Sequence, residues 1–326
     1  MYRESPKVSI IVPLFNKGPY VAETIRSAMS QTTKDLEIVV VDNGSNDDGP
    51  GIVQQLAVTD ARILFVTAPG RGPGHARNYG VEQSSSDWIL FLDADDILEP
   101  NHLASLLEVH SQNPNANVIA GGWKEFRDGY PNQLTVKKPC GADPSPCLLD
   151  SAIASSPWVV HAVMLKRELA IKTPWPEDMD KVLAEDNAFW FRICLNATVA
   201  YSAECGALYR TQTHDCRTQS DDIAKWFTGV HEAVTRNISA LHEHALKPNG
   251  KQARALMHLY SELYTKAEKA NDQKYKTLAL QQANYWLKES SKSNEAKTPS
   301  MLFRRLLGIP LTQRLKLLLS QTSYAR

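Results

Sequence analysis

Two carboxylates one residue apart, Asp93 and Asp95, follow an unbroken apolar run in this chain. Carboxylates at this spacing suit a divalent cation such as Mg²⁺ or Mn²⁺, which takes oxygen ligands and often keeps phosphate oxygens in its shell. A second interpretation is an acidic helix start, because Asp95 and Asp96 before Ile97 would favour the positive end of a helix dipole. These acids by themselves leave both interpretations open.

A second acidic pair, Glu185 and Asp186, begins a segment with apolar residues at helical spacing. A carboxylate at such a point can act as a general base that removes a proton from a hydroxyl nucleophile. Acids also stabilise a helix start by up to about 1 kcal/mol through the dipole, so a structural role stays open.

A polar stretch from Tyr209 to Arg217 contains His214 and two arginines, Arg210 and Arg217. Such a loop could close over a diphosphate, with His214 as a further metal ligand or phosphate contact. Ordinary solvent exposure is the competing explanation.

The elements that would position these side chains alternate between strand and helix in the N-terminal part of the chain. Helical spacing of apolar residues marks 21–29, 76–81 and 103–107, and strand-like apolar runs span 8–12, 36–41, 63–66, 88–92 and 118–120. This alternation predicts an α/β fold with a mostly parallel, doubly wound sheet. The carboxyl ends of its strands would meet at one edge, where open α/β sheets bind their ligands.

Other polar side chains follow the same strand ends. An acid after the second strand can accept hydrogen bonds from a nucleoside, and the glycine-rich loop 72–80 could let backbone approach a phosphate. Each feature alone also fits an ordinary turn or helix start. The glycine fingerprint of a dinucleotide site does not follow the first strand, which argues against an NAD site. The strand-end residues are Pro13, Phe15, Asn16, Asp42, Asn43 and Ser45.

Four segments, taken in order, resemble the sequential blocks of family 2 glycosyltransferases. The resemblance is close over residues 6–125 and looser to about residue 220. It implies a GT-A fold and transfer of a sugar from a nucleotide donor with inversion at the anomeric carbon. The family often has two acids in its second block, and here Asn43 takes the place of one. The segments are VSIIVPLFN (8–16), IVVVDNGS (38–45), GPGHARNYG (72–80) and ILFLDADD (89–96).

The resemblance implies roles for the matching residues. Asp42 would hydrogen-bond the base, with uracil favoured, and Arg77 would lie near the nucleotide or brace Asp42. Asp93 would face the ribose and the sugar, while Asp95 would ligate a Mn²⁺ or Mg²⁺ ion that bridges the diphosphate. Asp93 and His214 complete the expected metal set. The other expected nucleotide-sugar contacts are Pro13, Phe15, Asn16, Asn43, Ser45, Gly74 and Ala94.

The acceptor side of the resemblance rests on the second acidic pair. The second acid of the family's Glu-Asp motif is usually the base, so Asp186 is favoured and Glu185 is the alternate. Asp96 is expected to start a helix rather than to ligate the metal. His161, within an expected strand at 158–164, is expected to be a packed strand histidine rather than a catalytic one.

The composition excludes several classes of protein. Lys plus Arg equals Asp plus Glu, 36 each, so no overall field favours a nucleic-acid partner. Five cysteines without metal-knuckle spacing fit free thiols in a reducing cytosol. The N-terminus is polar without a secretory signal, and no apolar run approaches the ~20 residues of a membrane span. We therefore expect a cytoplasmic protein.

We expect a GT-A domain over residues 1–220, with a nucleotide-sugar half at 1–125 and an acceptor half at 126–220. A helical region over 221–326 would follow. Its tail, residues 300–326, carries many leucines, five basic residues and no acid. Such a tail could lie on an anionic membrane at its inner face, or its leucines could pack on the helical region or another subunit.

The sequence thus predicts an inverting, hexosyltransferase-type glycosyltransferase. A UDP-sugar would be the donor, and the acceptor would be a saccharide or lipid-linked saccharide in surface polysaccharide or glycolipid assembly. One alternative is a nucleotidyltransferase, which would want a basic, glycine-rich loop where residues 13–16 stand. Another is a subunit that binds a nucleotide sugar without turnover. The sequence names neither the sugar nor the oligomeric state.

Overall fold

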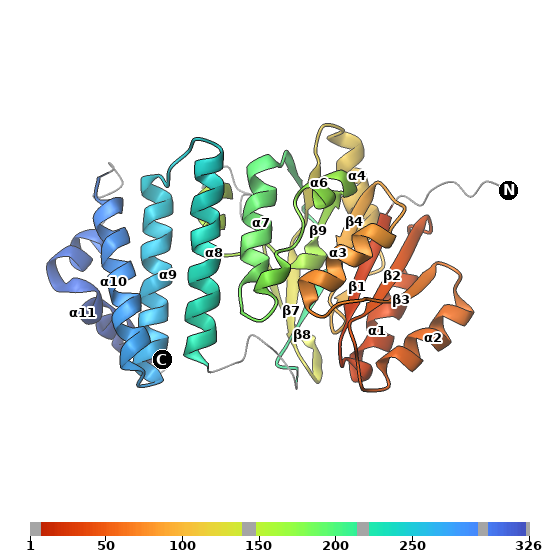
Figure 1. Ribbon diagram of the computed structural model, residues 1–326, viewed down its shortest axis with the longest axis horizontal. Coiled ribbons are helices and arrows are strands. Elements are labelled where there is room, and N and C mark those ends of the chain that lie inside the picture. The colour runs from red at the N-terminus through yellow and green to blue at the C-terminus, as the bar shows by residue number, and fades with distance from the viewer. Residues whose placement is uncertain (1–7, 139–147, 214–221, 293–298, 324–326) are drawn as a thin grey trace. The chain divides into compact units, whose positions relative to one another are not determined.

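The computed structural model describes residues 8–138, 148–213, 222–292 and 299–323, with the side chains of the last helix described from 304 to 316. These residues fall into two compact units (Figure 1). The first unit holds both β-sheets and the helices packed on them. The second holds the short helix α5, residues 182–191 and the helices that follow residue 222.

Within the described residues, the larger sheet of the first unit has seven strands in the order β10-β6-β9-β4-β1-β2-β3. Only β9 runs antiparallel to its neighbours in this sheet, so the expected mostly parallel sheet is confirmed. The strands are β1 (Val8–Leu14), β2 (Leu36–Asp42), β3 (Ile63–Thr67), β4 (Trp88–Phe91), β6 (Val118–Ala120), β9 (Val163–Lys166) and β10 (Val199–Tyr201).

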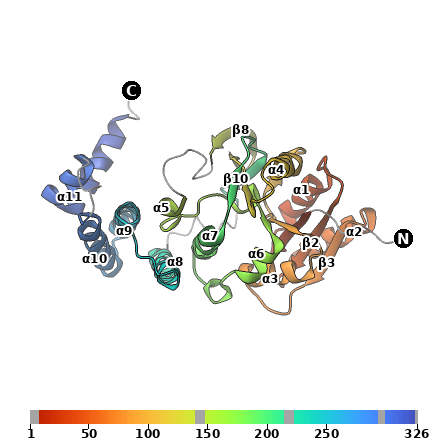
Figure 2. The ribbon, with the colours of Figure 1, turned by 90° about the horizontal axis from the view of Figure 1, so that it is seen from above.

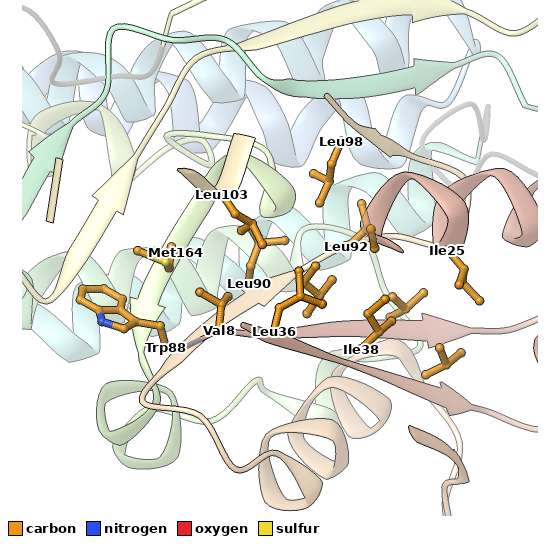
Figure 3. Close-up of a cluster of buried hydrophobic side chains, with 14 of the residues drawn as sticks. Val8, Ile25, Leu36, Ile38, Trp88, Leu90, Leu92, Leu98, Leu103 and Met164 are labelled. Carbon is orange, nitrogen blue, oxygen red and sulfur yellow. The ribbon is translucent and has the colours of Figure 1, made fainter. Parts of the chain in front are cut away.

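Helices cover both faces of this sheet. Alternate residues of β1, such as Val8, join a core with Ile25 of α1 and Leu103 of α4 (Figure 3). The intervening residues of β1 face α3, where a side chain in place of Gly80 would collide with Ile11. That close approach accounts for glycine in the middle of a helix, where it otherwise destabilises. The helices are α1 (Gly18–Met29), α2 (Gly49–Thr59), α3 (Pro73–Gln83), α4 (His102–Gln112), α6 (Arg167–Lys172) and the short 3₁₀ helices η1 (Val160–Ala162) and η2 (Glu177–Met179).

A second sheet of the first unit has four strands in the described residues, in the order β5-β11-β7-β8. Its first strand immediately follows the acids at the end of β4, and it pairs antiparallel with β11. The second sheet therefore holds the C-terminal end of the acidic loop, residues 93–96, in place. Its strands are β5 (Ile97–Leu98), β7 (Trp123–Arg127), β8 (Tyr130–Lys137) and β11 (Ala207–Thr211).

The second unit is helical, and α8, α9 and α10 lie side by side in it (Figures 1 and 2). Asp222 caps α8 by accepting from two backbone N–H groups, and Asn249 with Gln252 forms a capping box on α9. The last helix is broken at Gly308, whose φ is 75°. None of the described helices is long and apolar enough to cross a membrane. The helices are α5 (Leu148–Ala152), α7 (Glu185–Asn196), which both units share, α8 (Ile223–Glu243), α9 (Gly250–Lys269), α10 (Gln273–Ser290) and α11 (Pro299–Ser323).

Candidate functional site

The polar residues predicted at the strand ends lie at one edge of the larger sheet. Strands β4, β1 and β2 are direct neighbours, with β1 in the middle. Leu14 of β1 pairs with Asp42 of β2, and Leu92 donates its N–H to the carbonyl of Ile11, so the next residue, Asp93, stands at the same edge. Because β1 pairs parallel with both β2 and β4, the carboxyl ends of the three strands share this edge.

The turns after β1 and β2 are tied to each other by hydrogen bonds. The N–H of Asn16 donates to Ser45 Oγ at 3.1 Å, and the N–H of Ser45 donates to Asp42 Oδ1 at 3.0 Å. Asn16 has a φ of 50°, a left-handed conformation that asparagine tolerates well. Phe15 beside it exposes about half of its ring. The edge thus presents an apolar ring on an ordered turn, while Asp42 is largely buried and its Oδ1 holds the turn.

The glycine-rich loop has a partner that the sequence did not suggest. The carboxylate of Asp180 accepts from the N–H of Gly74 at 2.8 Å and from the N–H of His75 at 3.1 Å, at the start of α3. Gly72, with a φ of 125°, donates its N–H to Asn43 Oδ1. Because the start of α3 holds the chain's own carboxylate, the expected phosphate contact of the Gly74 N–H is not available in this arrangement.

Arg77 is buried and holds Asp93. Its Nη2 lies 2.7 Å from Asp93 Oδ1, and its guanidinium lies over the Trp175 ring, 4.2 Å from the centroid. Burial would raise the pKa of Asp93, but the charge and hydrogen bond of Arg77, helped by more distant charges, outweigh it and lower that pKa. Asp93 is therefore an anion at neutral pH, and Arg77, which was expected near the nucleotide or against Asp42, pairs with Asp93.

Asp95 is the other carboxylate of the predicted metal pair. It lies 2.8 Å from Lys17 Nζ, and about a fifth of each side chain is exposed. Its neighbour Ala94 is buried. In the described residues no group of three or more His, Cys, Asp or Glu side chains could hold an ion without help. Two carboxylates still fit Mg²⁺ or Mn²⁺ when a diphosphate and water supply the remaining oxygens.

Asp96 does not start a helix, which corrects the sequence-based expectation. It is almost wholly buried, it precedes β5, and its Oδ1 accepts the N–H of Arg210 at 2.7 Å. Burial, then the charges of Asp95 and Asp93, raise the pKa of Asp96 well above its usual range. Burial lowers the pKa of His161 to about 4. His161 Nδ1 lies 3.2 Å from Asp96 Oδ2, and burial disfavours the charged form of both groups.

His161 is packed as expected, but not on a strand. It lies in η1, directly before β9, and is fully buried. A strand was expected over 158–164, whereas β9 begins at Val163.

Arg210 is a candidate positioning residue whose location the sequence did not indicate. It was expected in a polar loop over a diphosphate, but it lies in β11 and is buried. Its Nε donates to the carbonyl of Asp95 at 2.7 Å, and its two Nη atoms pair with Asp128 and Glu23. The rings of Tyr20 and Phe126 flank the guanidinium. Arg210 thus holds the backbone of the acidic loop, while His214 and Arg217 lie outside the described residues.

Glu185 and Asp186 begin α7 within the second unit. Glu185 is buried and Asp186 is partly exposed. The residue before them, Ala184, has a φ of 69°, an uncommon conformation for a non-glycine residue and one that clusters at functional sites. The next residue, Asn187, is fixed by a hydrogen bond to the carbonyl of Ala152. The helix start is therefore held rigidly, with Asp186 the more accessible of the two acids.

Residues 9–147 match the family model described as Glycosyl transferase family 2. Over 130 residues the chain is 36% identical to an uncharacterized glycosyltransferase of Haemophilus influenzae, covering 40% of this chain and 51% of that protein. Over 105 residues it is 39% identical to a GalNAc(5)-diNAcBac-PP-undecaprenol beta-1,3-glucosyltransferase of Campylobacter jejuni, covering 32% and 34%. The chain thus spans about half or less of the length of these relatives.

Solved structures show the same fold. TarS of S. aureus in complex with UDP-GlcNAc has a TM-score of 0.58 at 19% identity, over 88% of this chain and 91% of that chain. The mannosyltransferase PcManGT of Pyrobaculum calidifontis, in complex with GDP-Man and Mn²⁺, has a TM-score of 0.51 at 19% identity, over 89% and 87%. The predicted GT-A fold is confirmed.

Proposed function

We propose that this chain, whose residues 9–147 match glycosyl transferase family 2, transfers a sugar from a nucleotide donor to an acceptor hydroxyl with inversion at the anomeric carbon. One observation carries the proposal: Asp42, Asp93 and Asp95 stand on neighbouring strand ends, beside an exposed aromatic ring. Open α/β sheets bind ligands at this edge. The similar chains that bind UDP-GlcNAc or GDP-Man support a nucleotide sugar as the donor.

The nucleoside would lie against the turns after β1 and β2. Asp42 accepts a hydrogen bond from the base, for which we favour uracil because its N3–H donates where the carboxylate accepts. Phe15 covers the base, and Asn16 with Ser45 fixes the shape of the turn. The remaining predicted contacts of this pocket are Pro13, Asn43, Gly74, Arg77 and Ala94, where Arg77 acts through Asp93 and Gly74 through the position of its helix.

Mn²⁺ or Mg²⁺ would be held by Asp95, with Asp93 beside it and with His214 as the further predicted ligand. When bound, such a cation stabilises the negative charge that develops on the diphosphate leaving group. The chain's own residues do the rest. Arg77 keeps Asp93 ionised and oriented toward the ribose and sugar, and Arg210 fixes the backbone of Asp95.

Asp186 is the proposed general base, with Glu185 as the alternate. It takes the proton of the acceptor hydroxyl as that oxygen attacks the anomeric carbon and the nucleoside diphosphate leaves. Its partial exposure supports this choice over Glu185, which is buried. A carboxylate can accept a proton directly from a hydroxyl within hydrogen-bond reach.

The acceptor we propose is a saccharide or lipid-linked saccharide, in surface polysaccharide or glycolipid assembly at the cytoplasmic face of a membrane. The undecaprenol-linked substrate in the name of the Campylobacter relative supports the lipid-linked class. The balanced charge of the chain, 36 basic and 36 acidic residues, gives no support to a nucleic-acid acceptor.

The test is release of UDP from UDP-sugars, measured with and without Mn²⁺ and with candidate acceptors. An enzyme releases UDP with at least one sugar and releases it faster when an acceptor is present. Donor binding without any UDP release would instead identify a subunit that binds nucleotide sugars without turnover.

A further inference from the structure

The last helix of the second unit exposes four leucines and buries two polar side chains. Leu306, Leu307, Leu311 and Leu315 are exposed, with 81% of Leu306 accessible to solvent. On the same helix Arg304 and Gln313 are buried, together with Ile309. A surface helix of a globular protein buries its apolar stripe and exposes its polar one. Here the exposed leucines cannot be explained as packing within the unit.

Two side-chain contacts fix this orientation of α11. The Nη1 atom of Arg304 lies 2.8 Å from the sulfur of Met257 on α9, and Arg314 pairs with Glu268 of the same helix at 3.2 Å. Gly308 then breaks the helix, so that Leu306 and Leu307 end one piece. Leu311 and Leu315, four residues apart, share one face of the next piece.

Exposed basic residues accompany these leucines along the helix. Arg305, Arg314 and Lys316 are exposed among them, and residues 300–326 contain five basic side chains and no acidic one. Burial, and then the charges of Arg304, Lys316 and Arg254, lower the pKa of His258 on α9 to about 4. An apolar row within a basic surface is the pattern of helices that lie at an anionic interface.

We infer that the exposed part of α11, which carries Leu306, Leu307, Leu311 and Leu315 together with exposed basic residues, binds the surface of an anionic phospholipid membrane. The leucines enter the headgroup boundary, and the basic residues contact lipid phosphates. The inference rests on the proposed function only in its purpose, which is to bring the enzyme to a lipid-linked acceptor.

A second copy of the chain is the less suitable partner. A two-fold interface places the same patch of both subunits on itself, so the basic residues of one α11 would face those of the other. Like charges brought together across an interface cost free energy. A lipid surface of opposite charge complements both the leucines and the basic residues.

The test is co-sedimentation of the full chain with vesicles of phosphatidylcholine alone or of phosphatidylcholine with phosphatidylglycerol. We expect binding to the anionic vesicles that weakens as salt is raised, because salt screens surface attraction. The triple variant Leu306→Ser, Leu311→Ser, Leu315→Ser should lose this binding. Its melting temperature should fall only slightly, because these side chains are exposed and serine is only a somewhat poorer helix former than leucine. Leu246→Ser, also at an exposed leucine of the second unit, is the matched control and should bind like wild type.

Charge is tested separately with Arg305→Gln combined with Lys316→Gln. Each basic residue near an anionic surface contributes about fivefold in affinity, so the pair should weaken binding by about 25-fold. Lys172→Gln, at a well-exposed lysine of the first unit, is the control for charge alone.

Three results would overturn the inference. The first is that wild type fails to bind anionic vesicles at low salt, and the second is that the triple leucine variant binds them as well as wild type does. The third is a wild-type dimer in solution that dissociates in this variant. UDP release with a soluble acceptor, measured without vesicles, separates the two proposals. All these variants should keep that activity, and its absence from wild type would reject the enzyme assignment while leaving the membrane result intact.

Discussion

Replacing Arg210 with methionine is the sharpest test of how the acidic loop is held. Methionine keeps the apolar contact with Tyr20 and Phe126 but removes the donors to the Asp95 carbonyl, to Asp128 and to Glu23. Hydrogen bonds to charged groups contribute about 1.5–3 kcal/mol each when buried. Glu23 is more than half exposed and Asp128 is about a third exposed, so water compensates much of their loss.

The net cost should therefore be about 2–4 kcal/mol, mostly from the buried guanidinium and the Asp95 carbonyl. For a unit of this size that lowers the melting temperature by about 5–15 °C. Replacing a residue that orients a metal ligand commonly lowers metal affinity by about 10–100-fold. The Mn²⁺ concentration needed for donor binding should therefore rise by about that factor. Arg210→Lys should recover only part of this, since lysine lacks the planar fork.

Thermal unfolding and Mn²⁺-dependent binding of a UDP-sugar measure the two effects. Lys124→Met is the matched control. Lys124 lies on β7, the strand next to β11, and its Nζ pairs with Glu99 Oε1 at 2.6 Å, but its side chain is partly exposed. It should cost no more than about 1 kcal/mol and leave the Mn²⁺ dependence unchanged. If Arg210→Met melts like wild type and needs no more Mn²⁺, Arg210 does not position the acidic loop.

Three further predictions concern separate parts of the chain. Asp186→Asn should bind donor normally but slow transfer by about 10²–10⁴-fold, whereas loss of transfer in Glu185→Gln instead would reverse the assignment of the base. Asp180→Ala should destabilise the start of α3 by about 0.5–2 kcal/mol in denaturant unfolding, and an unchanged midpoint would show that its two hydrogen bonds add nothing. Burial lowers the pKa of His102 to about 4, so the neutral form is stabilised in the folded state. Its contribution is complete above about pH 6.5 and is lost as pH falls toward 4, so His102→Gln should flatten the loss of stability over that range, and an equally steep loss would contradict the assignment.

The larger sheet was predictable because its strands are apolar runs bounded by polar turns. Strands β1, β2 and β4 are almost wholly buried, and parallel strands buried on both faces are read directly from such runs. The same runs placed Asp42, Asp93 and Asp95 at one edge. Strand β8 escaped prediction because nearly all of its residues are exposed, so no alternation of apolar side chains marks it.

Other residues were misplaced by the sequence because contacts with residues far along the chain override the local pattern. Asp95 and Asp96 before Ile97 look like a helix start, but residues 97–98 pair with β11, and Asp96 accepts from a residue 114 positions away. Gly74 looks like a phosphate contact until Asp180, 106 positions away, takes its N–H. For Arg210, burial of its neighbour Ala207 and the pairing of β11 with β7 were the missing information.

We propose that Asp95 holds a cation through which a nucleotide sugar binds at the strand-end site. Calorimetric titration of UDP-sugars into wild type and Asp95→Asn, each with and without Mn²⁺, tests it most directly. Loss of the Lys17 pair should cost at most about 1 kcal/mol, because both side chains are partly exposed, so the variant should stay folded. We expect Mn²⁺-dependent donor binding in wild type and none in Asp95→Asn. Equal donor affinity in the two proteins at saturating Mn²⁺ would contradict it.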